Sequence, residues 1–138
     1  MEIIDNKGRR YKAEVNIGTI AKAEKSLGVN LCRLLDSEEG IASLNDPLRV
    51  CEYIYHISDA SEQGISFEDF GSGFAGDALG EAIKQFQIEL TNFFHNPRRM
   101  MVKKVFDLFA EAQAKAVESL DAAALAPAAG NSPGNTAE

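Results

Sequence analysis

The sequence has 138 residues, of which 45% are hydrophobic and 25% charged, a composition that suits one globular domain with one core. The formal net charge of −7 argues against a dedicated nucleic-acid-binding protein, because such proteins present a basic face. The N-terminus lacks the apolar stretch of a secretory signal, and no run of residues is long enough to be a membrane span, so we expect a cytosolic protein.

The first 16 residues predict a β-hairpin. Asn6 and Gly8 tolerate the positive backbone angles of a tight turn. Tyr11, Ala13 and Val15 then alternate with polar residues, which is typical of a strand with one covered face.

From Ile17 onward the apolar residues follow helical spacing. Gly28 is placed to end the first helix, and a short helix is predicted over residues 31–35. A polar loop should follow. Asp46 and Pro47 then predict the start of another helix that runs to about Ser58.

Two long amphipathic helices are predicted in the second half of the chain. Apolar residues repeat at helical spacing from Leu79 to Phe94 and again from Met101 to Leu120, and Asn96-Pro97 provides a cap and a first turn for the second helix. Because the connection is short, we expect the two helices to pack antiparallel.

The last segment, residues 122–138, is rich in Ala, Pro and Gly and has one charged residue, so it predicts a disordered tail. The predicted fold is therefore a mainly α-helical domain over residues 1–121, with an N-terminal β-hairpin at about residues 1–16.

Residues 59–69, DASEQGISFED, resemble the start of a calcium-binding EF-hand loop, with Asp59, Ser61 and Gln63 at the ligand positions and Gly64 at the turn. The apolar residue that should follow two positions later comes one position early. The last ligand would then be an Asp with a short reach. We expect instead a loop that leads into a short helix capped by Ser66.

The next residues, Gly71 to Gly76, complete the pattern G-x-G-x-x-G, which binds nucleotides when it lies between a buried strand and a helix of a parallel βαβ unit. The preceding ISFEDF is a poor buried strand because it contains two acids. The glycines are predicted to form a tight turn between helices, with Asp77 near the start of the second.

Reactive residues do not form a recognisable catalytic or metal-binding pattern. Cys32 and Cys51 lie in apolar contexts and predict buried free thiols, and neither His56 nor His95 has a partner at metal-ligand spacing. We therefore assign no catalytic, cofactor-binding or metal-binding residue, and we expect neither an enzyme nor a small-molecule substrate.

Residues 98–104, RRMMVKK, concentrate four basic side chains at the start of the last helix, where cations oppose the helix dipole. One interpretation is a solvated face neutralised by acidic neighbours. The other is a docking patch for an acidic partner, with the two methionines as adaptable apolar contacts.

The order of these segments resembles the tail assembly chaperones of long-tailed bacteriophages and prophages. The resemblance extends from about Ile3 to about Phe94. Its most characteristic pieces are Ala23-Glu24-x-x-x-Gly28-x-x-Leu31 and Ile65-Ser66-Phe67-Glu68-Asp69-Phe70.

The resemblance implies a small helical factor in the host cytoplasm, absent from the mature virion. It would bind the long tape measure protein and keep it soluble until tail tube subunits assemble around it. A longer product made by ribosomal frameshifting would recruit the tail tube protein, and the chain would self-associate. The alternative is a non-catalytic helical adaptor or regulator of another pathway.

A protein that binds a long helical partner needs exposed apolar and charged side chains between helices. The predicted partner-binding residues are Phe93, Phe94, Arg98, Arg99, Met100, Met101, Lys103 and Lys104. Adjacent helical residues point about 100° apart, so at least one of the two phenylalanines should belong to the core.

Overall fold

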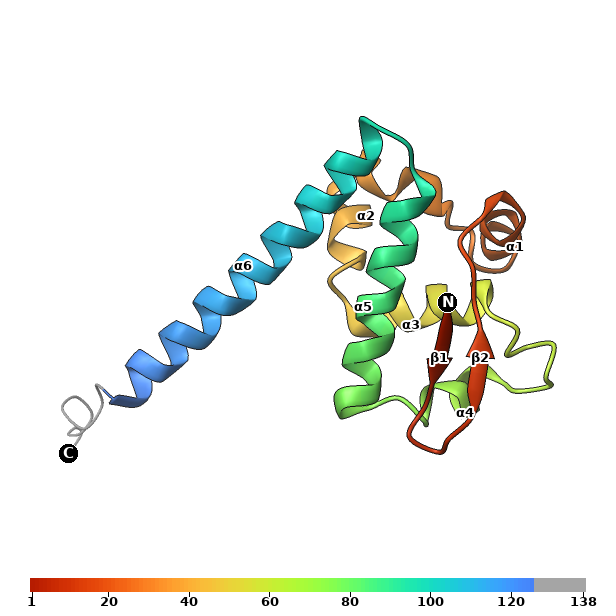
Figure 1. Cartoon of the computed structure of the whole chain (residues 1–138), viewed down its shortest axis with the longest axis horizontal. Coiled ribbons are helices and arrows are strands. Elements are labelled where there is room, and N and C mark those ends of the chain that lie inside the picture. Colours follow the sequence, from red (N-terminus) through yellow and green to blue (C-terminus); the bar gives the residue numbers. More distant parts are fainter. Residues whose placement is uncertain (126–138) are drawn as a thin grey trace. The chain divides into compact units, whose positions relative to one another are not determined.

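The computed structural model describes the backbone of residues 1–125 and the side chains of residues 1–121 (Figure 1). These residues belong to two compact units. The first comprises Met1–Lys103, and the second begins at Lys104. Within the described residues, the first unit is mainly helical, as predicted, and the second consists of part of one helix.

The elements follow one another in the order β1 (Glu2–Ile4), β2 (Arg10–Lys12), α1 (Ile17–Leu27), the 3₁₀ helix η1 (Leu31–Asp36), α2 (Glu38–Ser43), α3 (Pro47–Ile57), α4 (Phe67–Gly71), α5 (Gly76–Phe93) and α6 (Arg98–Leu125). The helix α2 replaces the loop predicted before residue 45. Ser37 caps it by accepting a hydrogen bond from the Gly40 amide at 3.0 Å, and acidic residues occupy its first turn, where they favour the helix dipole.

The predicted hairpin is confirmed. Its strands β1 and β2 are antiparallel with Ile3 opposite Tyr11, and Gly8 takes a positive φ of 80° in the turn. Ile3 and Tyr11 both point into the core, together with Ala13 and Val15. The alternation of apolar and polar residues therefore identified the covered face correctly.

The core of the first unit lies between the hairpin and the helices. In sequence order, α1 packs on α3, α3 packs on both α4 and α5, and α5 packs on β1. Aromatic rings fill much of this space: Tyr11 meets Phe70 with ring centroids 4.9 Å apart, and Phe86 is fully buried beside Tyr53.

Three helix ends have the caps predicted from the sequence. Gly28 ends α1 in the left-handed conformation and donates its amide to the Glu24 carbonyl. Asp46 and Ser66 cap α3 and α4 with their side chains. The start of α1 also has a reciprocal capping box between Asn16 and Thr19, which the sequence reading did not identify.

Both long C-terminal helices are present. The first, α5, ends at Phe93, slightly before the predicted end, and α6 extends to Leu125. The antiparallel packing of the two helices stays a prediction, because most of α6 belongs to the second unit. Of the predicted tail, residues 126–138 lie outside the described residues.

Candidate partner-binding site at the start of α6

The connection between α5 and α6 is organised around Phe94. This residue has extended backbone angles that end α5, and its side chain is buried with 8% of its surface exposed. Its ring packs edge to face against Phe93 at 5.1 Å, and the Arg98 guanidinium lies over it at 5.5 Å. Phe94 is therefore the phenylalanine that belongs to the core, and its ring is not available to a partner.

Arg98 begins α6 and ties it to η1. One terminal nitrogen donates to the Cys32 carbonyl and to the Asp36 carboxylate, each at 3.0 Å. Arg98, followed by Arg33, lowers the pKa of Asp36 below its usual value. The first basic residue of the cluster thus makes a specific contact with a segment more than sixty residues earlier in the chain.

Arg99 serves the end of the preceding helix. Its Nε donates to the Phe94 carbonyl at 2.7 Å, and a terminal nitrogen reaches the Asn92 carbonyl at 3.4 Å. Carbonyls at a helix C-terminus lack partners within the helix and carry the negative end of its dipole. A cation that opposes the dipole of α6 therefore stabilises the end of α5.

The next residues, 100–103, differ in how far their side chains are exposed. Val102 is 1% exposed and fixes the first turns of α6 in the core of the first unit. Met100 and Met101 are 67% and 53% exposed, and Lys103 is exposed beside them. Thioether side chains are flexible and polarisable, so they can adapt to an apolar partner surface.

The eight predicted binding residues therefore do not form one continuous surface. Phe94 is in the core, Arg98 and Arg99 are engaged by carbonyls and a carboxylate, and Lys104 belongs to the second unit. The structure leaves Met100, Met101 and Lys103 exposed on the first unit, with Phe93 half-buried at the end of α5. We call Met100, Met101 and Lys103 the methionine patch.

The EF-hand-like loop contributes to the packing of the hairpin. The Asp59 carboxylate accepts hydrogen bonds from the Lys12 amide and the Gln63 side chain, so its ligand oxygens hold β2 and the loop together. Gly64 turns the chain with a φ of 79°, and Tyr55 donates its hydroxyl to the Ile65 carbonyl at 2.6 Å. Within the described residues, no group of three or more acidic, His or Cys side chains could hold a metal ion.

The glycine motif lies between α4 and α5, as predicted, and meets the hairpin. The two described strands are antiparallel, so the glycines do not follow a strand of a parallel unit. Gly73 accepts a hydrogen bond from the Asn6 amide and lies against the Asp5 side chain. Its missing side chain allows this close approach.

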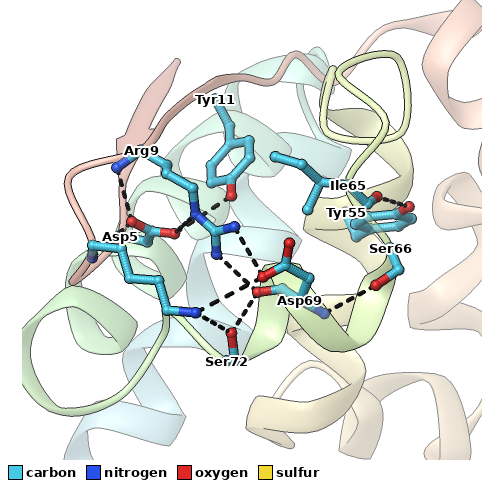
Figure 2. Close-up of polar contacts among 9 residues, drawn as sticks. Asp5, Arg9, Tyr11, Tyr55, Ile65, Ser66, Asp69 and Ser72 are labelled. Carbon is cyan, nitrogen blue, oxygen red and sulfur yellow. Dashed lines mark hydrogen bonds and ion pairs between the residues drawn. The ribbon is translucent and has the colours of Figure 1, made fainter.

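Figure 2 shows the polar network that fixes this contact. Asp5 is buried and accepts hydrogen bonds from the Arg9 Nε at 2.8 Å and from the Tyr11 hydroxyl at 3.4 Å. Arg9 reaches onward to the side chain and carbonyl of Asp69 in α4, at 3.0 and 2.8 Å. Ser66 caps the same helix on its Asp69 amide. The network joins the hairpin to the ISFEDF segment.

The two cysteines and His56 differ in exposure. Cys51 is buried, as predicted, but Cys32 is half-buried, because the 3₁₀ geometry of η1 directs Leu31 and Leu34 into the core instead. Burial raises the pKa of both thiols, and the Arg98 charge opposes this for Cys32. Burial lowers the pKa of His56, which favours the neutral imidazole. These groups are arranged as packing residues.

Comparison of the chain with protein-family models, curated sequences and solved structures gives no significant match. The side chains at the start of α6 carry the chemistry of this site. They offer an exposed apolar pair, a neighbouring cation and a rigid anchor, which suit the binding of another polypeptide.

Proposed function

We propose that this chain is a tail assembly chaperone of a long-tailed bacteriophage or prophage, which binds the tape measure protein and keeps it soluble during tail assembly. The observation that carries the proposal is the methionine patch. It presents flexible apolar side chains on a helix whose first turn is held in place by Arg98 and Val102. A chaperone for a long helical client needs such an adaptable surface on a rigid support.

The two sequence pieces that carry the resemblance have defined structural roles, which supports a shared fold. In the first piece, Gly28 ends α1 on the Glu24 carbonyl, and Leu31 is buried at the start of η1. In the second, Ser66 caps α4 and Phe70 is buried against Tyr11. These residues position helices.

The proposal places the protein in the host cytoplasm and outside the mature virion. No helix in the described part of the chain is long and apolar enough to cross a membrane. A frameshifted extension would carry the contact with the tail tube protein, so the methionine patch would serve the tape measure protein. The patch presents two exposed thioether side chains, and we therefore expect it to favour an apolar face of a helical segment of that client.

The proposal can be tested by co-expression with the tape measure protein encoded in the same phage or prophage. We expect the client to become soluble and to co-purify with this chain. The variant Met100→Asp with Met101→Asp should abolish co-purification, because two carboxylates would replace the exposed apolar contacts.

A matched control is available in the first turn of α3, where Leu48 is 54% exposed. Leu48→Asp introduces the same chemical change at a similar helix position and should leave client binding unchanged. If the client stays insoluble beside the wild-type chain, the proposal fails, and a helical adaptor for another pathway becomes the better interpretation.

A further inference from the structure

The three methionines of the chain differ widely in the exposure of their side chains. Met100 and Met101, in the first turn of α6, are 67% and 53% exposed. The side chain of Met1 is 3% exposed. Small molecules dissolved in water can therefore reach two of the three thioethers, while the third is shielded.

The two exposed methionines point away from the core of the first unit. Successive residues of a helix are about 100° apart. Val102 is 1% exposed and marks the buried direction. Met101 therefore points about 100° from that direction and Met100 about 160° from it, which agrees with the larger exposure of Met100. A chemical change in either side chain alters the surface without entering the core.

Exposed thioethers can be oxidised by peroxides. The sulfur attacks one oxygen of the peroxide, so that a sulfur–oxygen bond forms and the oxygen–oxygen bond breaks. For hydrogen peroxide, the departing hydroxide takes up the proton of the transferred oxygen and leaves as water. The sulfur loses two electrons and the peroxide gains them. The product, methionine sulfoxide, is polar, whereas the thioether is apolar and polarisable.

We propose that Met100 and Met101 form a reversible oxidation site, at which a hydroperoxide converts the apolar part of the methionine patch into a polar surface and leaves the fold intact. One consequence rests on the proposed function, because oxidation of the patch would release the client. The modification itself requires no client.

The fold can tolerate this modification because the contacts that hold the start of α6 do not use either methionine. Arg98 donates to the Cys32 carbonyl and to the Asp36 carboxylate, and Val102 fills a buried site. Peroxides do not oxidise guanidinium or aliphatic groups. A sulfoxide disrupts a packed core, but at positions 100 and 101 it would project into solvent.

The surface, in contrast, would change completely. The third member of the methionine patch is Lys103, so oxidation of both methionines leaves no apolar side chain in the patch. Each sulfoxide oxygen binds water strongly. An apolar face of a helix offers no hydrogen-bond donor to replace that water, so binding such a face would leave a buried polar group without a partner. Oxidation should therefore oppose the binding of an apolar client segment.

Peptide mapping of the full chain after treatment with hydrogen peroxide tests the site. Trypsin cleaves after Lys7, Arg99 and Lys103, so it releases residues 1–7 and residues 100–103 as separate peptides. We expect the second peptide to gain two oxygen atoms, at a rate per methionine at least about tenfold higher than that of the first peptide. Equal rates in the two peptides would overturn the proposal.

Two further measurements on the oxidised chain distinguish a changed surface from a lost fold. The urea midpoint should stay at the value of the untreated chain, whereas retention on a hydrophobic-interaction column should decrease. Met100→Leu with Met101→Leu is the matched control, because leucine has a similar volume and is not oxidised by peroxide. Its retention should be unchanged by peroxide, although it keeps Met1 and both cysteines. A lower urea midpoint for the oxidised wild type, or an equal loss of retention in the control, would contradict the proposal.

Reversibility is tested with methionine sulfoxide reductases. Two such enzymes are needed, one for each epimer of the sulfoxide. Together they should return the oxidised wild type to its original retention. If the mapped sulfoxides resist both enzymes in the folded chain, the site is not a reversible one.

The consequence for the client is tested by oxidising this chain alone and removing the peroxide before the tape measure protein is added. The oxidised wild type should lose the client, and the peroxide-treated leucine variant should keep it. Equal co-purification with the oxidised and untreated wild type would overturn the release of the client. If the untreated wild type does not bind the client, the proposed function fails, and mapping and retention still decide whether the oxidation site exists.

Discussion

Replacing Gly73 by alanine should strongly destabilise the first unit. The added Cβ would lie 2.7 Å from the Asp5 Cγ and 2.8 Å from the Asp5 Cβ. Rotation of the Asp5 side chain cannot relieve the second contact, because the backbone fixes the position of Cβ. The carboxylate is also held by the Lys7 and Arg9 amides, each at 2.9 Å. The hairpin itself would have to move away from the loop.

The size of the effect follows from two costs. Overpacking of a well-packed site costs roughly 1–3 kcal/mol. The hydrogen bonds between Asp5 and Arg9 involve charged groups, and their full loss costs roughly 1.5–3 kcal/mol. Because the hairpin can move partway and keep some of these bonds, we expect a loss of about 3 kcal/mol in the free energy of unfolding. The midpoint of thermal unfolding should fall by roughly 10–20 °C.

Urea unfolding followed by circular dichroism at pH 7 measures this loss directly. Gly71→Ala is the control in the same segment, since its added Cβ meets nothing within 4 Å. We expect this control to stay within about 0.5 kcal/mol of the wild type. The reasoning is refuted if Gly73→Ala unfolds within that same range, because the Asp5 site would then not require a bare backbone at Gly73.

Two further predictions concern pH and the anchor of α6. Burial tends to raise the pKa of Asp5, but hydrogen bonds from Arg9 outweigh this effect and hold the pKa below its usual 3.8. The stability that this carboxylate provides is therefore present above about pH 4. It is lost as the pH falls through the lower pKa of the folded state. Asp5→Asn should therefore be less stable at pH 7 but lose less stability than the wild type between pH 5 and pH 2 in urea unfolding, and equal losses would contradict the role of Asp5. Val102→Ala should lower the free energy of unfolding by about 2 kcal/mol because it empties a buried site. Met101→Ala should change it by less than about 0.5 kcal/mol, and comparable losses in the two variants would show that Val102 is not an anchor.

Local chemistry made much of the fold predictable. Gly28 ends a helix because it accepts the left-handed conformation, and Asp46 and Ser66 start helices because their side chains bind free amides. The alternation in β2 likewise identified the buried Tyr11. Each of these signals lies within a few residues of the feature that it determines, so one sequence is enough to read it.

Two features with weak local signals or distant determinants were missed. The helix α2 has six residues and no buried side chain, so apolar spacing could not predict it. Its signal was the Ser37 cap followed by two acids, which is a weak pattern alone. The half-exposure of Cys32 likewise depends on how η1 lies against the other helices.

The candidate site was partly predictable for the same reason. The cluster of basic residues was visible in the sequence, and its conflict with the helix dipole was a correct warning that local stability did not explain it. The explanation lies in contacts of Arg98 with η1 and of Arg99 with the end of α5. Met100, Met101 and Lys103 remain exposed on the first unit, and their role in partner binding stays a prediction.

The network between the hairpin and α4 has a consequence for the order of folding. A two-stranded hairpin is marginally stable in isolation, and this one is completed by groups 60 residues later in the chain. During synthesis, β1 and β2 leave the ribosome well before Asp69 and Gly73 are made. We therefore expect the first strands to be translated to be among the last elements of the first unit to become stably ordered.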